Sequence, residues 1–325
     1  MLLLLASALL TGAIGDLRLE SGQILRDCRV TYRTYGNLNA DKSNVVLFPT
    51  WFNGASEDVE VYLKPGGLID TSKYYVIVAD ALANGNATSP SNYQYTTPQK
   101  FPRVTIRDMV ESQHQLLTKV LNLDRVKTVM GVSMGAMQAF QWAVSYPDFM
   151  ESLIPIVGTP RMSERDVMLW STYFKLGRNG EPQPEAAPAQ ASATEAATPK
   201  QSSLEKILGM LGQAPTMYKK YRQPFNAMRQ FDAIVAHDIS KLTNNDLDRA
   251  AAAMKARLLV VVATQDKAVS PETALQFARK NKAELMELKG PCGHQAYKCE
   301  IEALSPVLSR FLDAPSPAGP VIGVR

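Results

Sequence analysis

The amino-acid sequence predicts an α/β protein with a mostly parallel sheet covered by helices and a helical lid inserted between two halves of the sheet. Two observations indicate this. From Asp16 onward, short runs of β-branched residues alternate with amphipathic helical stretches. Between about residues 160 and 250 the alternation gives way to segments of helical period that are rich in Met, Tyr and Phe. The chain has 325 residues, which is long enough for one such core with an insertion.

Short apolar runs are expected to form the strands, and several are apolar on both faces, as buried parallel strands are. The expected strands are Cys28–Tyr35, Val45–Phe48, Tyr74–Ala79, Lys127–Val132, Leu153–Val157, Leu258–Thr264 and Glu284–Leu288. Thr105–Leu121 places apolar side chains on one helical stripe that only Gln113 interrupts. We expect this helix to pack on the sheet, just before the strand that begins near Lys127.

The domain boundaries follow from this pattern. Residues 15–160 and 250–315 are expected to form the core, and residues 161–249 the lid. Within the lid, residues 181–203 are rich in Ala, Pro, Ser and Gln and contain no aromatic or large aliphatic residue. Such a segment cannot bury enough area to offset its ordering entropy, so we expect a disordered linker there. Its flanks, Arg161–Leu176 and Leu204–His237, are helical in period.

Composition excludes several classes of function. The net charge is only +4, and no basic block with interleaved aromatic residues is present, which argues against nucleic-acid binding. The three cysteines cannot form a disulfide framework, and no Cys/His cluster has zinc-ligand spacing. We therefore expect no metal site and no bound cofactor.

The N-terminal apolar run, Met1–Ala13, is too short to span a membrane, which takes roughly 20 residues. It is typical of the core of a signal peptide, although no Lys or Arg precedes it. We treat residues 1–14 as a candidate signal segment and expect a periplasmic or secreted protein. A cytoplasmic protein with a frayed terminus remains the alternative.

A G-x-S-x-G motif, Gly131–Gly135, lies between an apolar strand and the helical segment Ala136–Ser145. In this context the serine sits on a strained turn that lifts its hydroxyl clear of the sheet, and flanking glycines avoid collisions there. The following helix N-terminus points at the reacting atom. We therefore predict Ser133 as a nucleophile. The alternative is a serine that merely fits a tight turn.

A serine hydroxyl needs an imidazole to accept its proton and a carboxylate to orient the imidazole. In α/β-hydrolases these residues follow in the order Ser, acid, His. Asp266 directly follows one late strand and His294 follows the last one, so we predict both as partners of Ser133. For His114, inside a helix, and His237, in the lid, we expect packing or solvent contact.

The oxyanion hole is expected to combine the backbone N–H of Met134 with one from the loop Pro49–Gly54. Proline cannot donate, so we choose Phe52 as the second donor and keep Trp51 as the runner-up. Trp51 is also a candidate substrate contact. Core packing is the alternative for both aromatic side chains, and it is compatible with donation because only the backbone donates.

Several segments occur in the order found in one known family: Leu19–Gly22, Tyr32–Asn39, Phe101–Val110 and Gly131–Ala139, followed by Trp142-Ala143. Together they resemble the homoserine O-acetyltransferase family, which has the α/β-hydrolase fold. The resemblance covers roughly residues 17–160 and 255–313 and fails in the lid.

In that family a serine is acetylated by acetyl-CoA, and the acetyl group then passes to the homoserine hydroxyl. The resemblance implies that Ser133, Asp266 and His294 form the catalytic triad. One departure concerns the substrate. Where the family has Gly-His-Asp, this chain has Gln295 after the histidine, which removes an acid well placed to pair with an ammonium group. We keep Gln295 as a candidate substrate contact.

Hydrolysis and acyl transfer share an acyl-serine intermediate and differ in the nucleophile that attacks it. A transferase must hold its acceptor and exclude water, whereas an esterase needs an open site and a general base. Loss of the acid after His294, a lid with a flexible linker and the expected export away from acetyl-CoA favour a carboxylic-ester hydrolase acting on a small-molecule ester. The alternatives are homoserine O-acetyltransferase or a related O-acyltransferase using acetyl-CoA, and a non-catalytic binding scaffold. Both a monomer and a homodimer remain open.

Two cysteines, Cys292 and Cys299, bracket His294. A disulfide requires Cα atoms within about 7 Å, and a helix starting between them could prevent that approach. We therefore expect free thiols. The alternative, for an exported protein, is a disulfide that staples the catalytic loop and leaves Cys28 alone.

Overall fold

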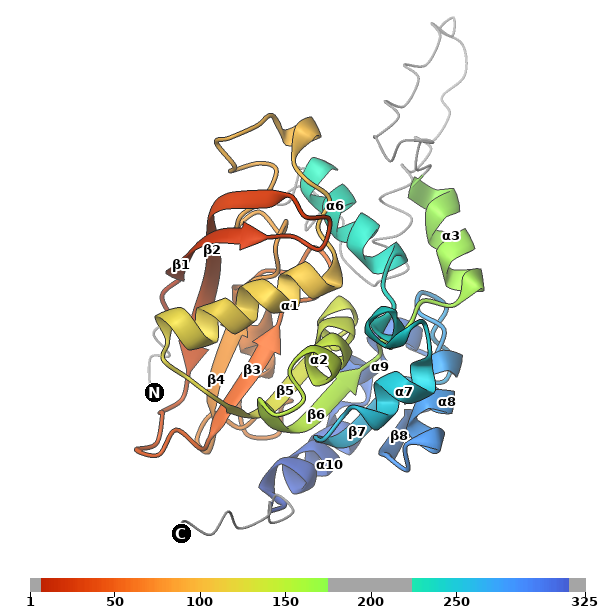
Figure 1. The fold of residues 1–325 in the computed structure, drawn as a ribbon. Helices are drawn as coiled ribbons and strands as arrows, with labels where there is room; N and C mark the ends of the chain where they lie inside the picture. Colours follow the sequence, from red (N-terminus) through yellow and green to blue (C-terminus); the bar gives the residue numbers. More distant parts are fainter. Residues whose placement is uncertain (1–6, 175–223, 316–325) are drawn as a thin grey trace, which may run out of the picture.

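The computed structural model of the chain describes residues 7–174 and 224–315. Its centre is an 8-stranded sheet with the order β1-β2-β4-β3-β5-β6-β7-β8. The pairs β1–β2 and β2–β4 are antiparallel and the remaining neighbours are parallel. The mostly parallel sheet covered by helices is thus confirmed (Figure 1). The linker expected at residues 181–203 lies outside the described residues.

Every strand expected from the sequence is present, with small shifts at the ends. The observed strands are β1 Leu10–Arg18, β2 Ile24–Tyr35, β3 Val45–Pro49, β4 Tyr75–Ala79, β5 Val126–Val132, β6 Met150–Ile156, β7 Arg257–Ala263 and β8 Glu284–Leu288. All side chains of β3 are buried, as expected for a parallel strand covered on both faces.

Strand β1 was not expected, and it begins inside the segment that we treated as a candidate signal. Residues 10–14 of that segment belong to β1, and Ile14 and Leu17 are buried in the hydrophobic core. The register against β2 shifts twice, between Ala13 and Gly15 and between Gly15 and Leu17. Such bulges break the period-two alternation by which a strand is recognised in a sequence.

Helices cover both faces of the sheet. One face carries α1 Ile106–Gln115, which continues as a π-helical turn at Leu116–Val120, together with α2 Met134–Ser145 and α8 Glu272–Lys280. The other face carries the 3-10 helix η1 Ser56–Tyr62, α9 Ala296–Cys299 and α10 Ile301–Asp313. Side chains of each central strand alternate between the two buried clusters, so the sheet separates two hydrophobic cores.

The chain between β6 and β7 forms the inserted region. It contains α3 Glu164–Phe174, α6 Pro224–Val235, the 3-10 helix η4 Ile239–Thr243 and α7 Leu247–Ala252. We call α3 and α6 the lid helices; Figure 1 shows α6 in the upper middle of the molecule and α3 to its right. A further short 3-10 helix, η2 Pro98–Lys100, precedes α1.

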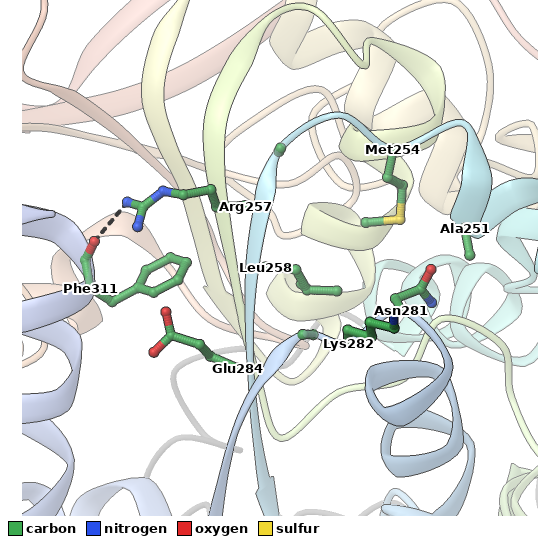
Figure 2. Close-up of a pocket in the computed structure, with 10 residues that line it drawn as sticks. Ala251, Met254, Arg257, Leu258, Asn281, Lys282, Glu284 and Phe311 are labelled. Atoms are coloured by element: carbon green, nitrogen blue, oxygen red, sulfur yellow. Dashed lines mark hydrogen bonds between the residues drawn. The ribbon is translucent and has the colours of Figure 1, made fainter. Parts of the chain in front are cut away.

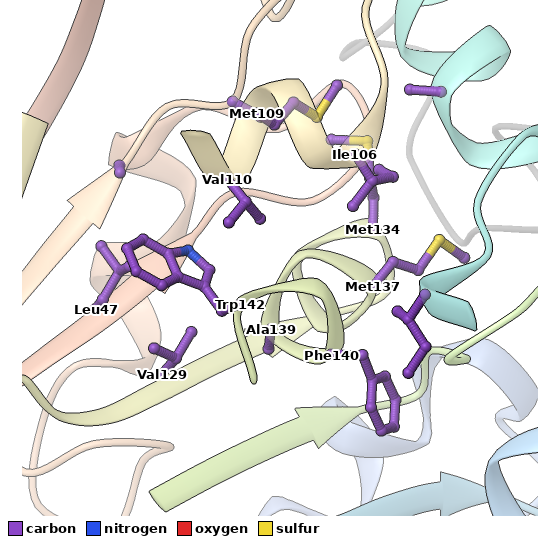
Figure 3. Close-up of a cluster of buried hydrophobic side chains, with 14 of the residues drawn as sticks. Leu47, Ile106, Met109, Val110, Val129, Met134, Met137, Ala139, Phe140 and Trp142 are labelled. Atoms are coloured by element: carbon purple, nitrogen blue, oxygen red, sulfur yellow. The ribbon is translucent and has the colours of Figure 1, made fainter. Parts of the chain in front are cut away.

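The core between α1, α2 and the sheet contains Leu47, Val110, Val129 and Trp142 (Figure 3). Gln113, which interrupts the apolar stripe of α1, is fully buried here. Its Nε2 donates to Gln138 Oε1 (2.6 Å), and its Oε1 accepts a hydrogen bond from Trp142 Nε1 (2.9 Å). A buried amide with both ends paired avoids the cost of an unsatisfied polar group, which explains how this glutamine is accommodated.

The strand order places a topological switch point in the sheet. From β3 the chain continues to β4 on one side, while β5 pairs with β3 on the other side. Ligands of open α/β sheets bind outside the carboxyl ends of the strands at such a point. A ligand site is therefore expected where β3 and β5 end. Among the described residues, no helix is both long and apolar enough to cross a bilayer.

The buried side chain of His237 indicates that the folded protein loses stability in acid. Its Nε2–H donates to the Thr159 carbonyl (3.0 Å), while Nδ1 has no hydrogen-bond partner among the described residues. A proton on Nδ1 would place an unpaired charge in the interior, and burial accordingly lowers the pKa of His237 to about 4.

Below pH 6.5 the unfolded chain therefore binds a proton that the folded protein does not, so stability falls as pH falls from about 6.5 to about 4. The loss attributable to His237 is about 3 kcal/mol. We expect His237→Gln, which keeps a donor for Thr159, to flatten this part of the profile. Denaturant unfolding of both proteins across the range measures the difference, and parallel curves would contradict the prediction.

Candidate active site

Ser133 lies on the tight turn between β5 and α2, where the sequence predicted a nucleophile. Its backbone has φ 56° and ψ −119°, a conformation that residues with a side chain rarely adopt. The two flanking glycines are required sterically. A Cβ at Gly131 would lie 2.3 Å from the Gly135 carbonyl oxygen, and one at Gly135 would lie 2.5 Å from the Pro49 carbonyl oxygen.

Three residues from distant parts of the chain form one hydrogen-bond chain. The Ser133 hydroxyl donates to His294 Nε2 (2.8 Å), and His294 Nδ1 donates to Asp266 Oδ2 (2.6 Å). All three side chains are buried. Because an ionised carboxylate can only accept, the Asp266 contact assigns the proton to Nδ1 and leaves Nε2 free to accept from serine. This arrangement suits nucleophilic acyl transfer.

The loop after β7 holds the Asp266 carboxylate in place. Asp266 Oδ1 accepts hydrogen bonds from the backbone N–H groups of Ala268 (2.8 Å) and Val269 (3.0 Å), which leaves Oδ2 directed at His294. The lid contributes here as well, because the indole N–H of Trp170 in α3 donates to the Ala268 carbonyl (2.7 Å). The acid is therefore oriented by its own loop and by a lid helix.

The histidine loop differs from expectation. Cys292 and Cys299 form a disulfide, so the prediction of free thiols was wrong. The chain between them makes the 3-10 turn η5 Gly293–Gln295 and the single turn α9, and this compact path brings the two Cα atoms to 6.5 Å. The loop is also tied to the end of β8, because the Glu300 carboxylate accepts the Gly290 N–H (2.9 Å).

The expected oxyanion donors belong to the start of α2 and to the loop after β3, two segments whose backbones meet at Gly135 and Pro49. Met134 is the first residue of α2, so its N–H has no intrahelical acceptor. The loop carrying Phe52 follows β3, which pairs with β5 and runs so close to Gly135 that the glycine has no room for a side chain. Parallel neighbours end at the same edge, which brings the two backbone segments together.

The aromatic side chains of this loop are packed in the core, the alternative left open by the sequence. Phe52 is 1% exposed and meets the Trp170 ring edge-on (6.0 Å between centroids). Trp51 is 8% exposed and meets Tyr62 edge-on (6.3 Å). Gln295 follows His294 at the end of η5 and is half-buried. The contacts of Trp51 and Gln295 with a substrate remain predictions.

The other two histidines do not join the triad. The His114 ring stacks on Tyr146 (3.8 Å between centroids), and His237 is buried beside Thr159. Two buried glutamines without an expected role contact the loop after β3, Gln138 and Gln230. Gln138 was detectable as a polar residue in an otherwise apolar segment of α2. Gln230 gave no such local signal.

A separate cavity of about 310 Å³ lies at the opposite edge of the sheet (Figure 2). It opens where β7 and β8 begin, at Arg257 and Glu284, whereas Asp266 follows the carboxyl end of β7. The Arg257 guanidinium donates to the Phe311 carbonyl (2.9 Å) and lies over the Phe311 ring. This cavity does not reach the triad.

Comparison with known families identifies the fold. Residues 44–298 match the family model described as the alpha/beta hydrolase fold. Over 279 residues, the chain is 32% identical to an ethyl acetate hydrolase from Pseudomonas veronii, which covers 78% of this chain and 79% of that protein.

Two further relatives extend over nearly the whole chain. A homoserine O-acetyltransferase from Pelobacter propionicus is 28% identical over 349 residues, covering 92% of this chain and 94% of that protein. Among solved structures, the acetyl esterase MekB superposes with a TM-score of 0.77 at 26% sequence identity, covering 95% of this chain and 98% of that one. The resemblance to homoserine O-acetyltransferases noted in the sequence is thus confirmed. The similar proteins also include esterases.

Reactivity of Ser133 tests the geometry of the triad. We expect a fluorophosphonate probe to label the wild-type protein at Ser133 and to leave Ser133→Ala unlabelled. Asp266→Asn and His294→Ala are expected to slow labelling severely, because the three residues act as a unit. Ser145→Ala, at the far end of α2, serves as the control and should label like the wild type. Labelling of Ser133→Ala at the wild-type rate would show that another residue is the nucleophile.

The Cys292–Cys299 disulfide can be tested by peptide mapping. Protein recovered from an oxidising compartment should yield a cross-linked peptide joining Cys292 and Cys299 in non-reducing peptide mapping, whereas Cys28 should be recovered alone. Reduction before digestion provides the control and should release two separate peptides. Complete alkylation of Cys292 and Cys299 without prior reduction would contradict the disulfide.

Proposed function

The chain belongs to the α/β hydrolase fold family, and on this basis we propose that it is a carboxylic-ester hydrolase that works through an acyl-serine intermediate. The observation that carries the proposal is the continuous hydrogen-bond chain from Ser133 through His294 to Asp266. The similarity to an ethyl acetate hydrolase over most of the chain supports hydrolysis of small acetyl esters.

In the first half-reaction, the Ser133 hydroxyl attacks the ester carbonyl carbon and His294 Nε2 takes its proton. The Asp266 carboxylate stabilises the imidazolium that forms. The imidazolium then gives the proton to the departing alcohol oxygen as the tetrahedral intermediate collapses to the acyl-serine. The side chains of Ser133 and Asp266 already lie within hydrogen-bond distance of His294, so little reorganisation of the protein precedes the attack.

The negative charge that develops on the carbonyl oxygen is stabilised by the backbone N–H groups of Met134 and Phe52. Loss of one such donor typically costs about 2.7 to 4 kcal/mol of transition-state stabilisation. The position of Met134 at the start of α2 supports this role, since the helix dipole also favours negative charge there. Both donors are backbone groups, which leaves the side chain of Phe52 available for packing.

In the second half-reaction, His294 Nε2 takes a proton from water as the water oxygen attacks the acyl carbon. The tetrahedral intermediate then collapses: the bond between the acyl carbon and Ser133 Oγ breaks, the imidazolium returns its proton to Oγ, and the carboxylic acid is released. Water is favoured over an amino-acid acceptor because Gln295 is neutral. An acid beside His294 would pair with the ammonium group of homoserine, and this chain lacks it at that position.

Homoserine O-acetyltransferase is the second candidate. The observation that favours it is the similarity over 94% of the length of the Pelobacter propionicus enzyme. Both functions use the same acyl-serine, so the choice rests on the second half-reaction.

We further propose that the protein works in an oxidising compartment, either the periplasm or outside the cell. The Cys292–Cys299 disulfide supports this, because disulfides persist mainly in such environments.

Product analysis separates the two functions. We expect the purified protein to hydrolyse p-nitrophenyl acetate at a rate that homoserine does not change, with acetate as the acyl product. With acetyl-CoA and homoserine as substrates, release of CoA should not exceed that of the Ser133→Ala control. Formation of O-acetylhomoserine, with CoA released in equal amount, would overturn hydrolysis in favour of transfer.

A further inference from the structure

The loop after β3, residues 50–54, carries the proposed oxyanion donor and has a demanding backbone conformation. Asn53, directly after Phe52, has φ 59°, and the Gly54 N–H donates to the Trp51 carbonyl (3.0 Å) to close a tight turn. Asn adopts the left-handed region more readily than most residues with a side chain, but it bears a steric cost there that glycine does not. The orientation of the Phe52 N–H therefore depends on contacts that hold this turn.

One of these contacts comes from the lid helix α6. The Asn53 N–H donates to Gln230 Oε1 (2.8 Å), and Gln230 Nε2 donates to the Leu82 carbonyl (3.2 Å). Gln230 is fully buried, with 0% of its surface exposed. The amide end of this side chain carries both an acceptor and a donor, so it satisfies a backbone N–H and a carbonyl together. Its orientation is thus set by both partners.

The other end of the loop is held by the nucleophile helix. Gln138 Nε2 donates to the Thr50 carbonyl (3.0 Å) and to the Met134 carbonyl (3.2 Å). Gln138 in turn accepts from the buried Gln113 of α1. The loop is therefore fixed on both sides of Phe52, once from the core and once from the lid.

We propose that Gln230 is a positioning residue for ester hydrolysis: through the Asn53 N–H it holds the turn at residues 51–54 in the conformation that aims the Phe52 N–H at the oxyanion. The proposal rests on the proposed function, since it assumes an oxyanion at that place. It assigns to lid helix α6 a part in transition-state stabilisation, in addition to any role in covering the site.

If Gln230 only held α6 in place, other buried side chains of α6 that hydrogen-bond to neighbouring segments would matter equally for activity. Asn226 is such a side chain and provides the matched comparison. It lies one helical turn before Gln230, is also buried, and makes two hydrogen bonds to a loop outside α6. Its Oδ1 accepts the Ser91 N–H (3.0 Å), and its Nδ2 donates to Ser91 Oγ (2.8 Å). Ser91 lies in a loop to which we assign no catalytic part.

The test compares Gln230→Met, Gln230→Glu and Asn226→Leu in p-nitrophenyl acetate hydrolysis, with thermal unfolding of each. Gln230→Met keeps the size of the side chain and removes both hydrogen bonds. We expect its kcat to fall by about 10- to 100-fold, since misplacing a catalytic group by about 1 Å can lower the rate by about 100-fold. KM should change little. Gln230→Glu, which can still accept from Asn53, should recover part of kcat, and Asn226→Leu should keep it.

Equal losses of kcat in Gln230→Met and Asn226→Leu would overturn the proposal, as would an unchanged kcat in Gln230→Met. If Gln230→Met does not fold, Gln230→Glu takes its place in the comparison. A kcat below that of Asn226→Leu then supports the proposal, and an equal kcat overturns it.

A second measurement needs no turnover. A trifluoromethyl ketone adds reversibly to an active-site serine and places an oxyanion in the hole. We expect the Kd of this inhibitor to rise in Gln230→Met and to stay constant in Asn226→Leu. If the wild-type protein hydrolyses no ester, the proposed function fails. The inhibitor then decides the role of Gln230 separately, and equal affinity for wild type and Gln230→Met overturns it.

Discussion

The site depends on the backbone conformation at Ser133. A residue with a side chain held at φ 56° and ψ −119° costs of the order of 1–3 kcal/mol, so the surrounding structure must compensate. The Ser133 N–H donates to the Ile156 carbonyl of β6 (2.9 Å), and the Ser133 carbonyl accepts from the N–H groups of Ala136 and Met137. These bonds anchor the turn to the next strand and to the first turn of α2. They allow one residue to end a strand, begin a helix and present its hydroxyl.

The same constraint explains why the neighbouring segments approach so closely. Gly131 and Gly135 have no room for a Cβ, and the atom that Gly135 would meet belongs to Pro49 at the end of β3. The elbow and the loop after β3 are therefore in backbone contact. Each remaining part of the site is then fixed locally: Asp266 by its own loop, His294 between two disulfide-bonded cysteines, and residues 50–54 by two glutamines.

The features that could be predicted from the sequence are those that depend on neighbouring residues in the chain. The buried strands appeared as apolar runs, and the elbow appeared as glycines flanking a serine. Asp266 and His294 followed from their positions after strands. Strand β1 was missed because its bulges interrupt the alternation of side chains. The disulfide was predicted wrongly because seven residues of separation do not specify the path of the chain between them. Gln230 could not be found, since its partners lie 177 and 148 residues away.

The central claim is that Ser133 carries the acyl group during turnover. Rapid acid quench of the enzyme during hydrolysis of p-nitrophenyl acetate, followed by peptide mass spectrometry, tests it most directly. Our account predicts one acetyl group on the peptide that contains Ser133, formed at least as fast as the steady-state rate. Turnover without an acetylated peptide, or with the acetyl group on another residue, would contradict the account.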